Sequence, residues 1–226
     1  MSKKTLRIGL DFSAPIPLHT DYNSNDFEGF EVDLINEIAN ELQLKLEYSV
    51  SYWKDIIKAL QDSQIDVICS AGTISTERMK ELNFSKPYLD FHLCAVYNKA
   101  TLFPLNEFAN KKVGVRIETE AEKYLQQYYP ETELETFDTN DAIYECLKQM
   151  KIDVLVDDSP IAFGLLKQFP ELIISDYLPN SASQYAIILK KENLDLKKKI
   201  DTVIEKLQRN GFLENNRQKW FDEFQP

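Results

Sequence analysis

The sequence predicts an α/β protein built from two lobes. Along most of the 226 residues, segments with the pattern of a strand alternate with amphipathic segments of helical period. Such alternation is typical of a mixed, mostly parallel sheet flanked by helices. The alternation comes as two separate series, and the chain length fits two small domains. We therefore expect one sheet with its own helices in each lobe.

The first series starts with an apolar strand over 6–10. A helix over 29–42 follows, and its apolar face consists of Val32, Ile35, Ile38, Ala39 and Leu42. Alternation of apolar and polar residues then predicts a strand over 44–50. The remaining elements of the series are a helix over 53–60, a strand over 65–69, a short helix over 76–82 and a strand over 93–97.

The second series starts after the segment 98–110, which contains Pro104. Ser159-Pro160 predicts a helix start, because Ser is favoured at a helix cap and Pro at the first helical position. The predicted strands are 112–116, 134–137, 153–157, 172–175 and 184–189, and the predicted helices are 119–129, 142–150 and 159–168. Two polar-faced helices, 194–209 and 212–224, follow and are separated by Asn210-Gly211.

The composition excludes several classes of function. The net charge of −11 argues against nucleic-acid binding, because an acidic surface repels the phosphate backbone. No segment approaches the ~20 apolar residues of a membrane-spanning helix. The first residues carry no secretory signal, so we expect either a cytoplasmic protein or one whose leader has been removed.

The three cysteines, Cys69, Cys94 and Cys146, lie in apolar strand or helix patterns without close spacing. An odd number at such spacings is typical of neither a disulfide framework nor a zinc site. We expect buried free thiols instead, and no metal or other cofactor.

The segment from Ile65 to Tyr88 carries the strongest functional signal. A buried strand leads into small and hydroxyl residues, and Arg78 follows five residues after Thr73. Open α/β sheets bind small ligands at the carboxyl ends of their strands. A guanidinium fork pairs with the two oxygens of a carboxylate. The segment therefore predicts a site for a small carboxylic acid.

At this point the chain resembles the extracellular solute-binding proteins of family 3, the polar-amino-acid-binding periplasmic proteins of ABC importers. The early motifs that carry the resemblance are GFEVDL at 29–34, the run from Trp53 to Leu60 with Ile65-Asp66-Val67, TISTER at 73–78 and FSKPY at 84–88. The later ones are KVGV at 112–115, DVLVDDSP at 153–160, Tyr185-Ala186-Ile187 and Lys219-Trp220-Phe221. One motif alone would be weak evidence, but this many in order cover nearly the whole chain.

The resemblance implies a periplasmic-binding-protein-like clamshell of type II. Lobe 1 would comprise residues 1–97 and 187–226 and lobe 2 residues 98–186, with hinges near Tyr97-Asn98 and Tyr185-Ala186. The implied function is that of a soluble, non-catalytic, monomeric protein, periplasmic or facing the cell exterior. It would capture an amino acid in the interlobe cleft for an ABC transporter permease, and closure around the ligand would be a hinge motion.

The resemblance also assigns roles to individual residues. Arg78 and Thr73 would bind the ligand α-carboxylate, and Asp158 the α-ammonium. A backbone carbonyl of Ser70 or Ala71 would accept from the same ammonium. The remaining positions are Trp53, which would form a wall of the pocket, and Asp11, which would meet a polar ligand side chain.

One stretch departs from the family pattern. Where the family has Gly-Thr-Thr, this chain has Glu118-Thr119-Glu120. Glutamate lacks the positive-φ freedom of glycine, although Thr119 would still offer its amide. The additional acids would repel a ligand carboxylate. Together with Asp11 they favour a ligand with a cationic side chain, such as arginine or lysine.

Each assignment has a structural alternative. Arg78 could be a surface residue paired with Glu77 or Glu81, Thr73 a helix cap, and Trp53 a core residue. Asp158 could interact only with the dipole of the helix that follows it, and Asp11 could cap a turn. Two other functions also stay open. One is a cyclohexadienyl (prephenate or arogenate) dehydratase with Glu118 or Glu120 as its general acid. The other is the sensor module of a receptor.

Overall fold

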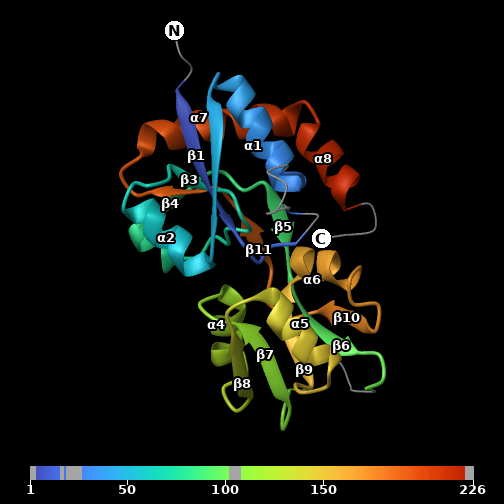
Figure 1. The fold of residues 1–226 in the computed structure, drawn as a ribbon. Coiled ribbons are helices and arrows are strands. Elements are labelled where there is room, and N and C mark those ends of the chain that lie inside the picture. Colours follow the sequence, from blue (N-terminus) through green and yellow to red (C-terminus); the bar gives the residue numbers. More distant parts are fainter. Residues whose placement is uncertain (1–3, 16–17, 19–26, 102–107, 222–226) are drawn as a thin grey trace. The chain divides into compact units, whose positions relative to one another are not determined.

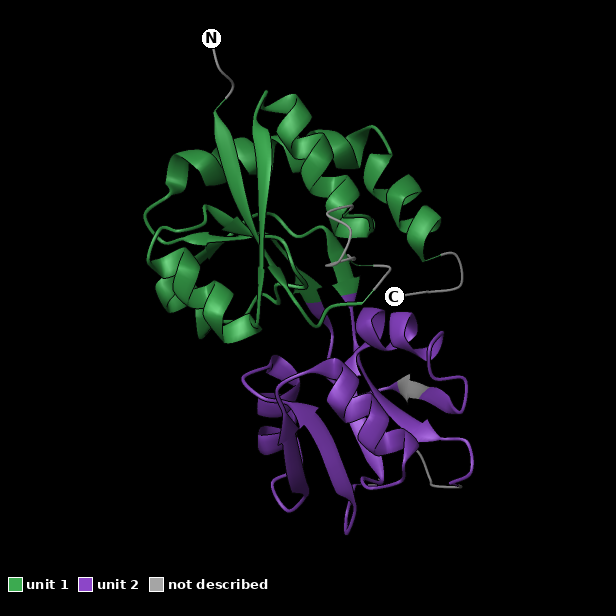
Figure 2. Ribbon diagram, viewed as in Figure 1, with its two compact units in different colours: residues 1–90, 184–225 green, residues 91–183, 226 purple. Residues whose placement is uncertain are grey.

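The computed structural model describes residues 4–15, 18, 27–101 and 108–221, which form two compact units (Figures 1 and 2). Unit 1 contains residues 1–90 and 184–225, and unit 2 contains residues 91–183. Each unit has its own five-stranded sheet, so the predicted α/β class with two mixed sheets is confirmed. No described helix is long and apolar enough to cross a membrane.

The sheet of unit 1 has the strand order β2-β1-β3-β12-β4. Its strands are β1 (Thr5–Asp11), β2 (Lys45–Ser51), β3 (Val67–Ile68), β4 (Leu82–Phe84) and β12 (Ile188–Lys190). β1 pairs in parallel with β2 and β3, whereas β12 runs antiparallel to β3 and β4. β2, β1 and β3 are therefore adjacent parallel strands whose carboxyl ends share one edge.

The helices in the described part of unit 1 are α1 (Phe30–Glu41), α2 (Trp53–Gln61), α3 (Arg78–Glu81), α7 (Leu194–Arg209) and α8 (Phe212–Trp220). α1, α7 and α8 pack on one another, and α2 packs on β1, β3 and β12 (Figure 1). Ile56 and Leu60 of α2 form an apolar cluster with Ile68 and Ile188 of the sheet. Burial of these side chains supplies the main driving force for assembling the unit.

The sheet of unit 2 has the strand order β10-β6-β9-β7-β8. Its strands are β6 (Leu93–Asn98), β7 (Lys112–Arg116), β8 (Glu133–Phe137), β9 (Val154–Asp158) and β10 (Leu172–Tyr177). Its helices are α4 (Glu120–Tyr128), α5 (Asn140–Lys148) and α6 (Ser159–Leu166). β7 and β9 are adjacent and parallel, so their carboxyl ends also share one edge.

The largest difference from the expected organisation concerns the strand at 93–97. It was assigned to lobe 1, but β6 pairs with β9 and β10 in the sheet of unit 2. All six of its residues are buried, and a strand buried on both faces carries no sequence pattern that tells which sheet it joins. The compact units thus divide the chain after residues 90 and 183, while the hinge positions near 97 and 185 stay predictions.

Short strands account for the other differences. The expected strand at 184–189 is two strands, β11 (Ser183–Tyr185), which pairs with β5 (Leu89–Phe91), and β12. Between them the Ile187 N–H donates to the Ser85 hydroxyl instead of to a ladder, at 2.9 Å. The expected helix at 76–82 shortens to α3, because Leu82 already belongs to β4. Three-residue strands are too short for a periodic signal.

The cysteines largely agree with expectation. Cys69 and Cys94 are buried, and burial raises the pKa of both thiols well above its usual value. Cys146 is partly exposed rather than buried. All three are free thiols.

Candidate ligand-binding residues

The predicted residues of unit 1 gather at the shared carboxyl edge of β2, β1 and β3. Asp11 ends β1, Trp53 follows β2 and opens α2, and the loop 70–73 follows β3. The Asp11 amide donates to the Ser70 hydroxyl at 2.8 Å, which joins the end of β1 to the loop. Asp11 is 4% exposed, and its carboxylate accepts from the Ser13 amide at 3.2 Å. The turn-capping alternative for Asp11 is thus realised, whatever else the carboxylate binds.

The loop 70–73 has an unusual backbone at Ala71, whose φ is +48°. Left-handed backbone is costly for a residue with a Cβ. The Ala71 N–H donates to Oε1 of Glu31 at 2.7 Å, and the Tyr88 hydroxyl donates to the same oxygen. A charge-assisted bond of this kind stabilises the left-handed conformation.

Gly72 lies directly against the segment that follows β11. A Cβ on Gly72 would come within 2.7 Å of the Ala186 carbonyl oxygen, so only glycine fits there. The Ala186 amide donates to the Gly72 carbonyl at 2.9 Å, and Thr73 forms an isolated β-bridge with Tyr185. The loop is therefore fixed on both sides.

Arg78 is also part of this group. Its Nη1 donates to the Thr73 carbonyl at 3.1 Å, and its guanidinium carbon lies 5.2 Å from the centroid of the Trp53 ring. A cation over an indole face is attracted by the ring quadrupole. Thr73, Arg78 and Trp53 are thus brought together, as the sequence predicted, although their binding of a ligand stays a prediction.

The predicted residues of unit 2 gather at the shared carboxyl edge of β7 and β9. Thr119 caps α4, since its hydroxyl accepts from the Glu122 amide at 3.3 Å and donates to the Arg116 carbonyl at 2.7 Å. Glu118 has φ +61°, so it adopts the left-handed conformation in spite of being a glutamate. Its amide donates to the Glu122 carboxylate at 2.7 Å.

Asp158 ends β9 and occupies the N-cap position of α6, where its side chain makes no capping bond. It is 9% exposed, and its amide donates to Oδ1 of Asp157 at 2.8 Å. Oδ2 of Asp157 accepts from the Tyr144 hydroxyl at 3.1 Å. Burial, followed by the charge of Asp158, raises the pKa of Asp157 to about 7. Two consecutive acids, Asp157 and Asp158, therefore end β9, whereas the sequence analysis assigned a ligand-binding role to Asp158 alone.

Comparison with known proteins identifies the family. The model of the bacterial extracellular solute-binding proteins, family 3, matches residues 6–223 of this chain. The chain belongs to this family. The resemblance predicted from the sequence motifs is thereby confirmed.

Relatives within the family bind different amino acids. The L-cystine-binding protein TcyJ of Escherichia coli (strain K12) is 29% identical over 220 residues, which cover 96% of this chain and 82% of that protein. A mutant of ArgBP from T. maritima is 31% identical over 97% of this chain and 96% of that chain, with a TM-score of 0.88. The ancestral amino acid-binding protein AncCDT-1, a precursor of cyclohexadienyl dehydratase, is 26% identical over 96% of this chain and 95% of that chain, with a TM-score of 0.86.

Three residues that lie beside the candidate ligand-binding residues were not predicted from the sequence. Glu31 is fully buried beside the loop 70–73, and Asp157 is buried beside Asp158. Both lie inside motifs that carry the family resemblance, GFEVDL and DVLVDDSP. A sequence signal for Glu31 exists, because residues 31, 35, 38 and 42 follow the i, i+4, i+7 and i+11 spacing of one helix face. Phe12 is the third: it is 43% exposed, and its ring centroid lies 5.7 Å from that of Tyr52, beside Trp53.

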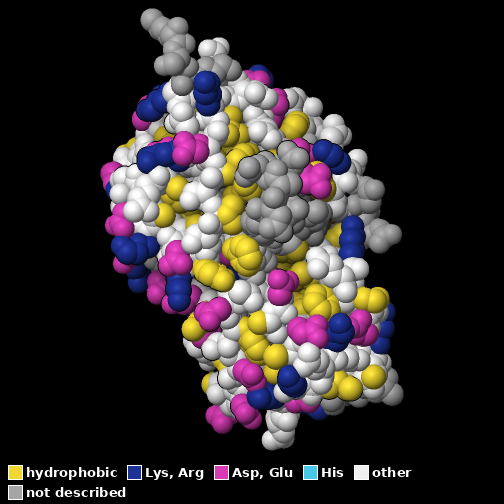
Figure 3. Space-filling model, in the orientation of Figure 1, with side chains coloured by type: hydrophobic (Ala, Val, Ile, Leu, Met, Phe, Trp, Pro, Cys, Tyr) yellow, Lys and Arg dark blue, Asp and Glu magenta, His cyan; other side chains and the backbone are white. Residues whose placement is uncertain are grey.

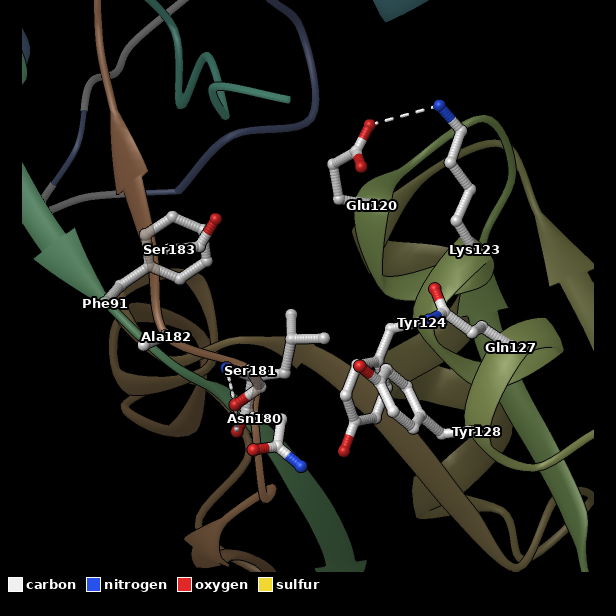
Figure 4. Close-up of a pocket in the computed structure, with 11 residues that line it drawn as sticks. Phe91, Glu120, Lys123, Tyr124, Gln127, Tyr128, Asn180, Ser181, Ala182 and Ser183 are labelled. Atoms are coloured by element: carbon white, nitrogen blue, oxygen red, sulfur yellow. Dashed lines mark hydrogen bonds and ion pairs between the residues drawn. The ribbon is translucent and has the colours of Figure 1, made fainter. Parts of the chain in front are cut away.

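Glu120 belongs to a different feature. Its carboxylate forms an ion pair with Lys123 at 3.1 Å, on the rim of a pocket of about 220 Å³ within unit 2 (Figure 4). Tyr124 and Tyr128 of α4 form one side of this pocket, and residues 180–183 line another. None of the predicted ligand-binding residues lines it. The described residues contain no group of three side chains suited to hold a metal ion.

Charged side chains of both signs occur on the face shown in Figure 3. On this face, Asp and Glu side chains are interspersed with Lys and Arg, and the Lys and Arg side chains form no large patch. Nucleic-acid binding would need a basic stripe or patch.

Proposed function

We propose that this chain captures an amino acid and delivers it to an ABC transporter permease. The observation that carries the proposal is the convergence of Arg78, Thr73 and Trp53 at the edge where β2, β1 and β3 end. A guanidinium beside a rigid loop that carries the Ser70 and Thr73 hydroxyls suits a carboxylate. The family membership and the names of the relatives support an amino acid over other carboxylic acids.

In the proposed complex Arg78 and Thr73 bind the α-carboxylate, and Asp158 binds the α-ammonium. Asp158 suits this role because it is a largely buried acid at the carboxyl end of β9. Ser70 or Ala71 offers a carbonyl to the same ammonium, and the Thr119 amide adds a donor.

We further propose that the ligand has a positively charged side chain, with arginine and lysine as the leading candidates. The support is the acidic character of Asp11 and Glu118, and a relative for which an arginine-bound form is known. Cystine is the competing ligand, because it carries a second ammonium group and is bound by TcyJ.

A binding protein fits the described residues better than the dehydratase alternative. Of the two acids considered as a general acid, Glu120 pairs with Lys123, and Glu118 is exposed. The similarity to a dehydratase precursor keeps the enzyme as a second candidate. We propose the periplasm or the cell exterior as the site of action, and a monomer as the functional form.

A thermal-shift panel with arginine, lysine, histidine, cystine and glutamine tests the proposal, followed by calorimetry on each hit. A ligand at 100 times its dissociation constant stabilises the protein by ~2.7 kcal/mol, which is a readily measured shift. The Arg78→Ala variant should lose about 10- to 150-fold in affinity, as expected for a lost charge-assisted bond. Arg209→Ala, an exposed arginine of α7, is the matched control and should bind normally.

The outcomes separate the candidates. Binding of no amino acid would contradict the proposed function, and binding of glutamine alone would contradict the cationic side chain. Asp158→Asn should weaken binding strongly, and unchanged affinity would mean that unit 1 holds the ligand without it. Conversion of prephenate by the wild type, abolished in Glu118→Gln, would instead support the enzyme.

A further inference from the structure

Glu31 is a buried carboxylate that the proposed ligand contacts do not use. It is 0% exposed and is the second residue of α1. Its Oε1 accepts two bonds, one from the Ala71 amide at 2.7 Å and one from the Tyr88 hydroxyl. A buried charge is tolerated only where hydrogen bonds compensate for its lost hydration. Both donors come from parts of the chain that lie 40 or more residues away from Glu31.

The bond to Ala71 determines the shape of the loop 70–73. Ala71 has a left-handed backbone, which alanine adopts reluctantly. In this conformation of the loop, the Ala71 amide has the buried Glu31 carboxylate as its acceptor. A constrained Ala71 also limits the orientation of the backbone groups beside it in the loop. These are the Ser70 carbonyl and the peptide groups of Gly72 and Thr73.

The bond to Tyr88 ties the same carboxylate to a second constrained segment. The Tyr88 amide donates to the Tyr185 carbonyl at 3.0 Å, and Tyr185 forms the β-bridge with Thr73. Burial, followed by the charge of Glu31, raises the pKa of Tyr88 well above its usual value, so its hydroxyl remains a donor. The Glu31 carboxylate therefore binds both the loop 70–73 and Tyr88. Tyr88 in turn contacts Tyr185, which forms the β-bridge with Thr73.

Other groups also hold the start of α1. The Glu31 amide donates to the Leu18 carbonyl at 2.9 Å, and Nδ2 of Asn216 in α8 donates to the Phe30 carbonyl at 2.9 Å. These two hydrogen bonds anchor the backbone of the helix start. The Oε1 atom of Glu31 accepts from the loop and from Tyr88, both outside its own helix.

We propose that Glu31 is a positioning residue for amino-acid binding, which fixes the loop 70–73 through the Ala71 amide without touching the ligand. This inference rests on the proposed function, because it assigns to Glu31 the orientation of groups that would meet the ligand.

The test compares Glu31→Gln with Asn216→Ala by calorimetry, at a temperature well below the melting point of both variants. Glutamine keeps the size of the side chain but replaces the carboxylate by an amide. Its NH₂ group is a donor and cannot accept from the Ala71 amide or the Tyr88 hydroxyl. Glu31→Gln should weaken amino-acid binding by at least about 10-fold. Asn216→Ala removes a buried bond to the same helix start without touching Ala71, so it should lower Tm while leaving Kd within about 2-fold.

A spectroscopic readout makes the test independent of the ligand. In the ¹H–¹⁵N spectrum of the ligand-free protein, the Ala71 amide should be shifted downfield and protected from exchange, and Glu31→Gln should remove both properties. Wild-type affinity in Glu31→Gln, or equal losses in the two variants, would overturn the positioning role. If the wild type binds no amino acid, the proposed function fails, while the Ala71 signal still reports whether Glu31 holds the loop.

Tyr88→Phe serves if Glu31→Gln does not fold. It removes one donor from Oε1 and leaves the bond to Ala71. Reduced protection of the Ala71 amide together with weaker binding supports the proposal. An unchanged amide signal and unchanged Kd overturn it.

Discussion

The guanidinium carbon of Arg78 lies 5.2 Å from the centroid of the Trp53 ring, while Nη1 of the same residue donates to the Thr73 carbonyl. Arg78 is the first residue of the four-residue helix α3 and Trp53 the first of α2. A short helix cannot position a long side chain by itself. The indole face and the carbonyl together limit where the guanidinium can go.

Replacing Trp53 tests this restraint. A cation–π contact contributes about 0.5–2 kcal/mol, so Trp53→Ala should weaken ligand binding by about 2- to 30-fold, chiefly through a less ordered Arg78. Trp53→Phe keeps a ring face and should lose less. Calorimetric Kd values of both variants check the ranking, and equal losses would mean that the ring contributes only apolar contact area.

Arg78→Lys should behave almost like Arg78→Ala. A lysine ammonium is a point charge that cannot bind Thr73 and a carboxylate with a planar fork. The expected loss in affinity is about 10-fold or more. Wild-type binding by the lysine variant would show that charge alone suffices at this position.

Gly72→Ala should destabilise unit 1 by about 1–3 kcal/mol, the usual range for an overpacked site. The added Cβ would meet the Ala186 carbonyl oxygen at 2.7 Å, and backbone cannot move aside easily. Gly9→Ala is the matched control, since the one close approach of its added Cβ, at 2.5 Å, is to the flexible end of the Ile65 side chain. Urea unfolding of both variants gives their free energies of unfolding. A larger loss of stability in Gly9→Ala than in Gly72→Ala would contradict the prediction.

Glu118→Gly should raise stability by about 1 kcal/mol, because glycine enters the left-handed region without the strain of a Cβ. Its backbone bond to the Glu122 carboxylate is retained, since the donor is the amide. Glu120→Gly, two residues away in the first turn of α4, should be destabilising instead. The free energies of unfolding from denaturant titrations should therefore change in opposite directions.

The stability of the protein should fall as the pH rises through neutrality because of Asp157. Its pKa is raised in the folded state to about 7, from its usual value of 3.8. A raised pKa means that the folded state holds the proton more tightly than the unfolded chain. The stability contributed by the protonated form is complete below pH 3.8 and is lost as the pH rises through about 7.

Melting temperatures measured between pH 5.5 and 8.5 check this dependence. Asp157→Asn should flatten the profile, because a neutral amide does not titrate and can still accept from Tyr144. Asp141→Asn, at an exposed position of α5, should leave the slope unchanged. A wild-type slope in Asp157→Asn would assign the pH dependence to another group.

The sequence predicted most elements because their periodicity is local. The strand at 6–10 and the helix at 29–42 correspond closely to β1 and α1. β4 and β5 have three residues each, too few for any period, and the sheet membership of β6 depends on partners far along the chain. Such pairing is decided by burial against other elements rather than by the strand itself.

The candidate site was predictable to the extent that motifs carry it. Trp53 and the loop that carries Thr73 come together as expected because they follow β2 and β3, which both pair in parallel with β1, and Arg78 bonds to Thr73. Glu31 was missed because its partners, Ala71 and Tyr88, are distant in sequence, and a glutamate in a helix is usually exposed. Asp157 was missed because neither spacing nor composition reports how deeply a strand end is buried.

The strand order of unit 1 has a consequence for synthesis from the amino terminus. β12 lies between β3 and β4 in the sheet, yet it is made about a hundred residues after them. Unit 2 is one continuous segment and can complete its own sheet as soon as residue 183 has emerged. The sheet of unit 1 has to wait for Lys190 with a gap between β3 and β4. The half of the protein that starts first therefore finishes folding last, and its unfilled β3 edge is exposed to wrong partners throughout that interval.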